Sequence, residues 1–336
     1  MRRDMAVLVT GVAGFIGAST ASALLDRGDE VVGIDNLDGY YDPNLKRARL
    51  EWLAKRFDNR FRFEQVDFSD AEALARLASN SKFDRIVHLG AQAGVRHSLE
   101  NPQAYVQSNL VGHCNMLELA RQNQSSHFVY ASSSSVYGGN KSLPFRVEDR
   151  VDHPLSLYAA TKKADELLSE SYASLYRVPM TGLRFFTVYG PWGRPDMAMW
   201  IFTDALYAGN PLPLFNRGEM RRDFTYIDDI VRGVLACLDA PPADDGAAKA
   251  GGSIAPHAVY NIGNHRSEDL MRVVELLEKA TGKKALLSPE PMQPGDVKES
   301  FADISAIERD HGFKPTTTID EGVPRFVEWY RGYHRL

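Results

Sequence analysis

The segment that most constrains this chain runs from Val7 to Leu25, where an apolar stretch enters a glycine-rich turn and then a helical pattern. A bound pyrophosphate needs backbone N–H groups aimed at it, and a side chain inside the turn would block its approach. Glycine gives the turn its φ freedom and its clearance, and the helix N-terminus adds favourable dipole charge. The pattern predicts a dinucleotide site, with a packing role for the glycines as the alternative. The residues of this predicted turn are Gly11, Gly14, Phe15, Ile16 and Gly17.

An acidic residue, Asp35, closes the next apolar run, residues 30–35. A carboxylate at this position can accept hydrogen bonds from both adenosine ribose hydroxyls and would repel a 2′-phosphate, so NAD is preferred over NADP. A solvated aspartate at a strand end is the alternative. Further residues are predicted to complete the cofactor site, among them Asp67 and Phe68 after the third strand and Leu89, Ala91 and Gln92 at the end of the fourth. The others are Asn36, Asn109, Ser132 and Phe185.

Short apolar runs alternate with longer helical patterns through the first half of the chain. The predicted strands are Ala6–Val9, Val31–Ile34, Phe61–Val66, Arg85–Leu89, His127–Ala131 and Met180–Phe185. The predicted helices lie near 16–27, 43–57, 70–79, 102–123 and 157–176. The apolar runs do not alternate with polar residues as a half-exposed strand would, as expected for a parallel sheet covered on both faces. The fold class is therefore α/β, a doubly wound Rossmann-type parallel sheet.

The strand–helix rhythm changes after Thr187, where a loop contains Pro191, Gly193 and Pro195. We assign 1–186 to a dinucleotide-binding domain. Residues 187–336 form a smaller lobe over the mouth of the sheet, with some segments returning to the Rossmann core. Residues 241–257 are rich in Ala, Gly and Pro, which indicates a flexible surface insertion.

Composition excludes several other classes of protein. The net charge of -5 over 336 residues is spread without a basic block, which argues against nucleic acid as the main partner. The apolar run 5–25 is better explained as a strand, a tight turn and a helix, and no other segment reaches the length of apolar sequence that a membrane span needs. Cys114 and Cys237 are far apart and show no metal or redox spacing, so we expect two buried thiols in a cytoplasmic protein. None of the nine histidines has metal-ligand spacing, and no metal is predicted.

Tyr158 and Lys162 lie four residues apart and so share one face of the predicted helix. A nearby ammonium favours the phenolate, which could take a proton from a sugar hydroxyl while hydride leaves the same carbon. The ammonium could also hold the nicotinamide ribose. Upstream, the serine run 132–135 follows the fifth strand, at the sheet edge where α/β proteins bind ligands. A surface Tyr–Lys pair and a serine-rich turn are the alternatives, but the ordered set of motifs favours catalysis.

The chain resembles the extended branch of the short-chain dehydrogenase/reductase family, and within it the UDP-glucuronate 4-epimerase group. The resemblance covers Val7 to about Tyr333 and is most specific in 35–43, 91–96, 184–197, 222–229 and 292–296. It implies that Tyr158 is the base, Lys162 its modulator, and Ser133 the hydroxyl that binds the substrate oxygen. The implied isomerase oxidises C4 of UDP-glucuronate, lets the 4-keto sugar turn, and reduces the opposite face, which gives UDP-galacturonate with NAD retained.

A 4-keto uronic acid is a β-keto acid that readily loses CO2, so its carboxylate must be held out of alignment with the ketone. By the resemblance, Ser134, Ser135 and Thr187 bind that carboxylate, and strand-end capping is the alternative for the two serines. Related decarboxylases and dehydratases have an acidic residue in or next to the position of Ser135, and its absence favours epimerisation. A decarboxylase, a UDP-glucose/galactose 4-epimerase and a non-catalytic NAD-binding protein remain as alternatives.

The resemblance also assigns the remaining substrate contacts and an assembly state. Arg222 and Arg194 are expected at the diphosphate, where the planar guanidinium suits two-point contacts, and Asp296 at the uridine ribose. A surface salt bridge is the alternative for each. The helices near 102–123 and 157–176 resemble those that pair two subunits through a four-helix bundle, which predicts a homodimer.

Overall fold

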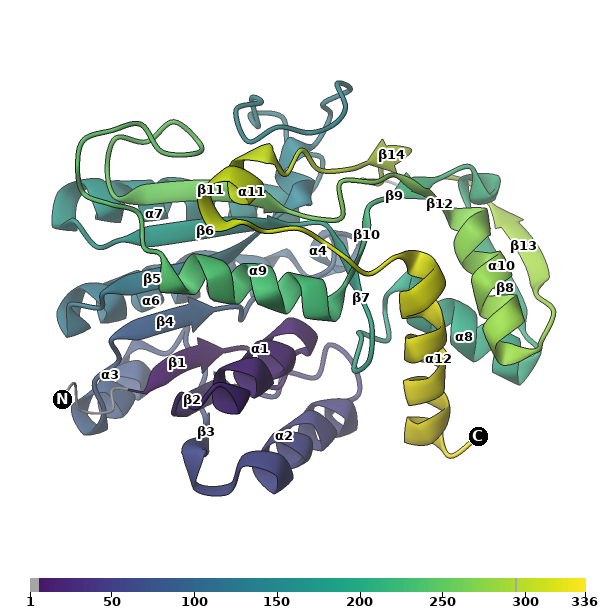
Figure 1. The fold of residues 1–336 in the computed structure, drawn as a ribbon, viewed down its shortest axis with the longest axis horizontal. Coiled ribbons are helices and arrows are strands. Elements are labelled where there is room, and N and C mark those ends of the chain that lie inside the picture. Colours follow the sequence, from purple (N-terminus) through teal and green to yellow (C-terminus); the bar gives the residue numbers. More distant parts are fainter. Residues whose placement is uncertain (1–5, 294) are drawn as a thin grey trace.

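A computed structural model describes residues 6–293 and 295–336, and a parallel sheet of seven strands lies at its centre (Figure 1). The strand order is β11-β6-β5-β4-β1-β2-β3. The order reverses at β1, between β4 and β2, and ligands bind beyond the carboxyl ends of strands at such a switch point. The doubly wound fold is confirmed. Its strands are β1 (Val7–Thr10), β2 (Val31–Asp35), β3 (Phe61–Gln65), β4 (Arg85–His88), β5 (His127–Ser133), β6 (Met180–Phe185) and β11 (His257–Ile262).

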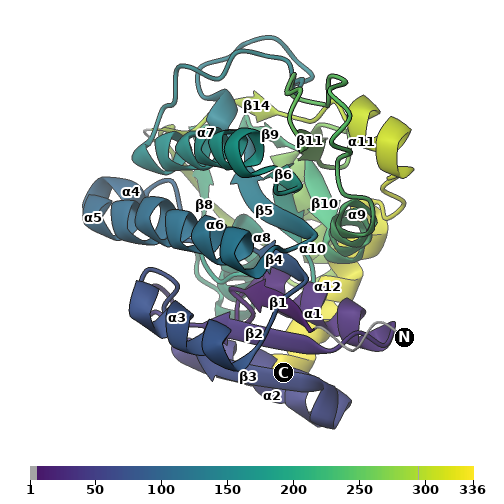
Figure 2. The ribbon, with the colours of Figure 1, turned by 90° about the vertical axis from the view of Figure 1, so that its left-hand side faces the viewer.

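Helices cover both faces of this sheet, because β1, β2 and β6 are buried along their whole length and need apolar cover on each side (Figure 2). One face carries α3 (Ala71–Asn80), α6 (Gly112–Asn123) and α7 (Leu157–Tyr176). The other carries α1 (Phe15–Asp26) and α9 (Ile227–Asp239), with α2 (Pro43–Phe57) beside α1. The predicted helix near 102–123 is formed by α5 (Pro102–Tyr105), a π-helical segment (Val106–Val111) and α6.

The sequence did not predict the seventh strand, β11, which pairs in parallel with β6. The segment 241–257 has no helix or strand until His257, which begins β11 and was wrongly placed in the insertion. Ala250 and Ala255 are buried, and Val259 N donates to Ala250 O, so the segment is anchored at its C-terminal half. The strand was missed because its partner lies far upstream in the chain.

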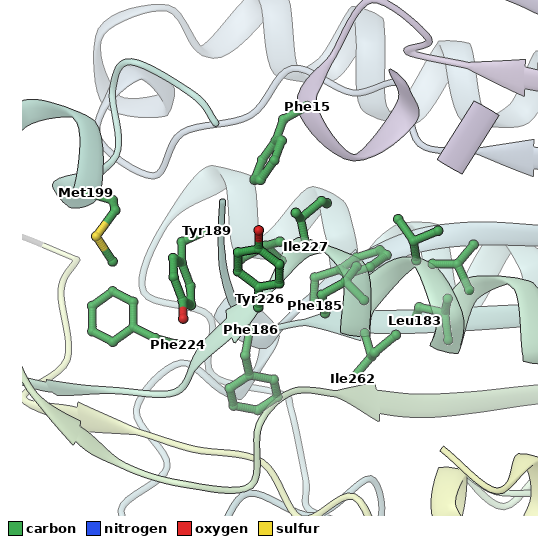
Figure 3. Close-up of a cluster of buried hydrophobic side chains, with 14 of the residues drawn as sticks. Phe15, Leu183, Phe185, Phe186, Tyr189, Met199, Phe224, Tyr226, Ile227 and Ile262 are labelled. Carbon is green, nitrogen blue, oxygen red and sulfur yellow. The ribbon is translucent and has the colours of Figure 1, made fainter. Parts of the chain in front are cut away.

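Most of the remaining elements form a second lobe, whereas two short helices, His97–Glu100 and Ser305–His311, pack on the sheet part, the first against α5 and α7 and the second against β11 and α9. The remaining elements are α4 (His97–Glu100), α8 (Ala198–Ala208), α10 (Leu270–Thr281), α11 (Ser305–His311), α12 (Ile319–His334), β7 (Thr187–Tyr189), β8 (Pro211–Phe215), β9 (Arg221–Arg222), β10 (Phe224–Tyr226), β12 (Glu268–Asp269), β13 (Leu286–Glu290) and β14 (Glu299–Ser300). The two parts share one apolar core, in which Phe15 of α1 lies in the same cluster as Met199 of α8 and Phe224 of β10 (Figure 3). This shared core fixes the lobe against the carboxyl ends of the strands.

Two further expectations concern the thiols and the membrane. Cys237 is buried as expected, but Cys114 is partly exposed, which corrects the prediction. Its position on α6 is covered only in part, and its sulfur lies 3.9 Å from the Tyr172 hydroxyl of α7. Within 6–293 and 295–336, none of the helices combines the length and apolar character that crossing a bilayer would require.

Candidate active site

A cavity of about 730 Å³ lies at the carboxyl ends of β1, β2, β4, β5 and β6 and extends to the second lobe. Most predicted site residues line it, although they come from distant parts of the chain. From the predicted cofactor and catalytic sets they are Gly11, Gly14, Phe15, Ile16, Gly17, Asp35, Asn36, Phe68, Leu89, Ala91, Gln92, Ser132, Ser133, Tyr158, Lys162 and Phe185, and from the substrate set Ser134, Ser135, Thr187, Arg194, Arg222 and Asp296.

The glycine turn has the geometry of a phosphate cradle. Gly11 adopts φ +65°, and Gly14 N donates to Gly11 O at 2.8 Å. A Cβ on Gly17 would overlap the carbonyl oxygen of Gly11, and a Cβ on Gly11 would lie 2.7 Å from Gly90 Cα. The turn therefore closes only with glycine at these positions, and it faces the cavity at the N-terminus of α1. These residues fit a dinucleotide pyrophosphate.

Asp35 lies at the end of β2 and faces the same cavity. Its carboxylate accepts from Leu37 N at 2.8 Å and from Ala13 N at 3.2 Å, which ties the strand end to the glycine turn. Burial raises the pKa of the Asp35 carboxyl, and the Lys46 ammonium, 3.9 Å away, opposes that shift. The sequence analysis missed Lys46, because only the packing of α2 brings it to this end of the cavity.

Two predicted cofactor residues, Asp67 and Asn109, lie outside the described cavity wall. Asp67 instead accepts from Asn36 Nδ2 at 3.0 Å and from Ser69 N at 2.8 Å, and so fixes the turn after β3. Asn109 is buried, exchanges two hydrogen bonds with the backbone of Gln92, and donates to Thr161 Oγ1 at 3.0 Å. These contacts support the cavity wall indirectly.

Tyr158 and Lys162 lie on the cavity side of α7, one turn apart. The Tyr158 ring packs edge-on against Tyr105, with 6.1 Å between the ring centroids. Lys162 Nζ donates to Ala131 O at 3.0 Å and to Asp165 Oδ2 at 3.1 Å. Burial raises the pKa of the Asp165 carboxyl to about 7, and Lys162 opposes that shift. The sequence analysis did not identify Asp165, which holds the ammonium in place at the floor of the cavity.

Three small hydroxyl side chains, Ser134, Ser135 and Thr187, line the cavity beside Ser133. β5 ends at Ser133, whose Oγ accepts from Ser135 N at 3.1 Å and caps a single turn of 3-10 helix, Ser134–Tyr137. Thr187 begins β7, which follows β6 and is far from the serine run in sequence. The cap holds the serine backbone in a fixed turn at the strand end.

Arginines gather where the second lobe meets the cavity. Arg222 and Arg96 both lie near Asp296, with N···O distances of 3.9 and 3.5 Å. The Arg96 guanidinium stacks over the Phe215 ring at 4.4 Å from its centroid. Arg96 and Phe215 also line the cavity and were not predicted as site residues. Two guanidinium groups around one carboxylate leave this region positive, which suits a diphosphate.

Arg194 lines the cavity and forms a second group of polar side chains with Asp196 and Tyr40. Its Nε donates to Asp196 Oδ1 at 3.0 Å, and Asp196 also accepts from the Tyr40 hydroxyl at 3.0 Å. Burial raises the pKa of the Tyr40 phenol to about 12, with the Asp196 charge adding to the shift, so Tyr40 stays a hydrogen-bond donor at neutral pH. The local Arg-x-Asp spacing could have indicated this pair.

A buried ion pair supports the serine segment from behind. Glu166 of α7 accepts from Arg184 of β6 through both carboxylate oxygens, at 2.8 and 3.0 Å, and from Ser132 Oγ at 2.7 Å. Burial opposes ionisation of Glu166, but the Arg184 guanidinium outweighs it and lowers the pKa of the carboxyl to about 2. Glu166 is therefore ionised whenever the protein is folded near neutral pH.

A Glu166→Gln variant should be less stable than the wild type by an amount that depends on pH. The folded pKa of Glu166 lies below its ordinary 4.5, so its contribution to stability is complete above about pH 5 and is lost as the pH falls toward 2. We expect a gap on the order of 3 kcal/mol at pH 6 that narrows at pH 3, measured by urea unfolding. A gap that stays constant with pH would contradict the assignment.

A parallel sheet with this glycine cradle, strand-end aspartate and Tyr–Lys pair defines a dinucleotide-binding α/β enzyme with a hydroxyl-rich substrate pocket. The family model described as GDP-mannose 4,6 dehydratase matches residues 8–326. The chain belongs to this family.

Among individual proteins, the chain is similar to several that are named UDP-glucuronate 4-epimerases. A probable UDP-glucuronate 4-epimerase of Rhizobium meliloti (strain 1021) is 48% identical over 98% of this chain and 98% of its own. UDP-glucuronate 4-epimerase 1 of Arabidopsis thaliana is 47% identical over 98% of this chain and 77% of its own. The crystal structure of UDP-glucuronic acid 4-epimerase from Bacillus cereus with UDP-glucuronic acid and NAD has a TM-score of 0.87 at 34% identity, covering 98% of this chain and 100% of that one. These similarities confirm the expected resemblance.

Proposed function

We propose that this protein inverts C4 of UDP-glucuronic acid through a 4-keto intermediate, which gives UDP-galacturonic acid with NAD as a retained cofactor. One observation carries the proposal: a single cavity joins the glycine cradle, the Ser133, Tyr158 and Lys162 side chains, and a pocket of small hydroxyls. The similarity to UDP-glucuronate 4-epimerases over nearly the whole chain supports this substrate.

Each catalytic side chain has a distinct task. Tyr158 takes the proton of the 4-hydroxyl and later returns it, while the Ser133 hydroxyl orients the reacting oxygen. Lys162 lies one turn from Tyr158 on the same helix and places its ammonium at the floor of the cavity, where it can hold the nicotinamide ribose. NAD supplies the hydride acceptor and donor when it is bound, with Gly11, Gly17 and Asp35 among its holding residues.

The pocket must also protect the intermediate from decarboxylation. Ser134, Ser135 and Thr187 donate hydroxyl hydrogen bonds to the sugar carboxylate and fix its plane relative to the C4 ketone. Ser135 and its neighbours offer no acidic group, whereas by the resemblance the related decarboxylases have one in or next to this position. Arg222 and Arg194 bind the diphosphate, and Asp296 binds the uridine ribose.

Incubation of the purified protein with UDP-glucuronate and no added cofactor tests the proposal. We expect UDP-galacturonate by NMR, because NAD is released slowly and regenerated in each turnover. UDP-pentose as the main product would support a decarboxylase, and faster turnover of UDP-glucose a neutral-sugar epimerase. Unchanged substrate in the presence of added NAD as well would indicate a non-catalytic NAD-binding protein and would overturn the proposal.

The assembly that we propose is a homodimer formed by the helical face of α7 and the 102–123 segment, which lie side by side (Figure 2). This face exposes apolar side chains that a monomer would leave in water, including Leu167 (59% exposed) and Leu175 (68% exposed) on α7. Val106 and Val111 add to the same face.

The two free cysteines suit a reducing compartment, and we propose the cytoplasm.

A Leu167→Glu, Leu175→Glu double variant should be monomeric, because each glutamate would place a charge inside the proposed apolar interface. Sedimentation velocity measures the change against the wild type, for which we expect a dimer. Leu287→Glu, at an exposed leucine of β13 in the second lobe, is the matched control and should leave the dimer intact. A monomeric wild type, or a double variant that remains dimeric, would contradict this interface.

A further inference from the structure

Tyr137 is a buried side chain that holds the serine turn in addition to the Glu166–Arg184 ion pair. Tyr137 is the last residue of the turn that begins at Ser134, and it is only 1% exposed. Its hydroxyl donates to Asn261 Oδ1 of β11 at 2.6 Å and accepts from Arg184 Nη1 at 2.9 Å. Because Arg184 is also paired with Glu166, the two ends of the serine segment are attached to one network, Glu166–Arg184–Tyr137.

The same network also supports the opposite side of the pocket. Arg184 lies in β6, one residue before the end of the strand, and Thr187 begins β7 directly beyond it. The Glu166–Arg184 ion pair therefore supports the backbone that carries the hydroxyls of Ser134, Ser135 and Thr187. A buried ion pair contributes little net stability over an apolar pair of the same volume, so its value lies in fixing geometry. A fully hydrogen-bonded buried network is rigid, which suits that task.

We propose that the Glu166–Arg184–Tyr137 network positions the carboxylate-binding hydroxyls and so determines how often the 4-keto intermediate loses CO2. The inference rests on the proposed C4 epimerisation. None of the three residues is assigned a contact with the reacting atoms, so they act as positioning residues through the serine turn and Thr187. Glu166 lies on α7, the helix of Tyr158 and Lys162, Tyr137 ends the 3-10 turn that carries Ser134 and Ser135, and Arg184 lies on β6, three residues before Thr187.

The competing step follows from the chemistry of a β-keto acid. The C5–C6 bond breaks, its electron pair moves into the C4 ketone to give an enolate, CO2 leaves, and C5 then takes a proton. The step needs no added oxidant or reductant once C4 is a ketone. It requires the C5–C6 bond to stand parallel to the π orbitals of the ketone. Hydroxyls held in one place prevent that rotation, whereas hydroxyls on a loosened turn permit it.

The test is the ratio of decarboxylated product to UDP-galacturonate during turnover of UDP-glucuronate. In Tyr137→Phe the hydroxyl is lost while the ring can keep its stacking on Phe145, whose centroid is 4.5 Å away. We expect this ratio to rise about tenfold. The 4-keto intermediate either loses CO2 or takes hydride back, and losing one buried hydrogen bond should change the difference between these two barriers by enough to shift the ratio by that factor. Released CO2 and the UDP-4-keto-pentose or UDP-pentose are quantified by mass spectrometry and NMR. Glu166→Gln should shift the ratio in the same direction and provides a second measurement if Tyr137→Phe fails to fold.

Tyr130→Phe is the matched control. Tyr130 is also a buried tyrosine, on β5, and its hydroxyl contacts His257 Nε2 at 2.9 Å, outside the network. Its product ratio should equal that of the wild type even if its stability falls. Unchanged ratios in both network variants, or an equal rise in the control, would overturn the inference while leaving epimerisation in place. A wild type that makes no UDP-galacturonate would instead overturn the proposed function, and the inference with it.

Discussion

A Tyr158→Phe variant should lose on the order of 10²–10⁴ in kcat for UDP-glucuronate, because the pocket then has no phenol to take the proton of the 4-hydroxyl. Lys162 keeps its hydrogen bonds to Ala131 O and Asp165, so the ammonium stays in place when the Tyr158 hydroxyl is removed. The edge-on packing against Tyr105 needs only the ring and should survive. NAD content and thermal stability should therefore remain close to those of the wild type.

The measurement is steady-state turnover by NMR or coupled assay, together with the NAD content of the purified protein. Tyr176→Phe is the matched control, since Tyr176 ends the same helix on its exposed side. It should retain wild-type kcat. Wild-type turnover in Tyr158→Phe would remove this residue from the mechanism, and loss of NAD in that variant would show that the phenol serves binding instead of proton transfer.

A Gly17→Ala variant should bind NAD roughly 10- to 100-fold more weakly, as expected for an added methyl group in a closely packed site. The new Cβ would overlap the carbonyl oxygen of Gly11 and crowd Val12 Cα at 3.1 Å. Both contacts are to backbone, which can give way only if the turn opens. An opened turn no longer aims its N–H groups at one pyrophosphate.

Titration calorimetry with NAD, and the cofactor content after desalting, measure this effect. Gly332→Ala on α12 is the control, because a Cβ at that position meets no atom within 4 Å. It should bind NAD as the wild type does and be slightly more stable, since alanine favours a helix over glycine. Equal NAD affinity in Gly17→Ala and the wild type would contradict the cradle geometry.

Local sequence was sufficient where one element carries the whole signal. The glycine turn follows its strand directly, and Tyr158 and Lys162 share one helix, so spacing alone brings their side chains together. The non-alternating apolar strands predicted a sheet covered on both faces, and β1, β2 and β6 are buried along their whole length, although the edge strand β3 is only partly buried. Asp35 could be placed because a strand end marks the carboxyl edge of a parallel sheet.

Contacts between distant segments decided the rest. β11 joins the sheet beside β6 only because the chain returns after α9. Two of the buried cations, Lys46 and Arg184, acquire their roles from partners on other elements: Lys46 lies on α2 near Asp35, and Arg184 lies on β6 and pairs with Glu166 of α7. Asp67, which is predicted to contact the cofactor, accepts from Ser69 N and so also fixes its own turn.

The sequence by itself thus determined the glycine turn and the placement of Tyr158 and Lys162 on one helix face, since each depends on residues a few positions apart, and the strand–helix rhythm determined the class of fold. Only the tertiary structure decided which hydroxyls face one another across the pocket and what holds them there. The physical reason is that parallel strands bring their carboxyl ends to one edge whatever their separation along the chain. Burial then decides which charges must find partners at that edge.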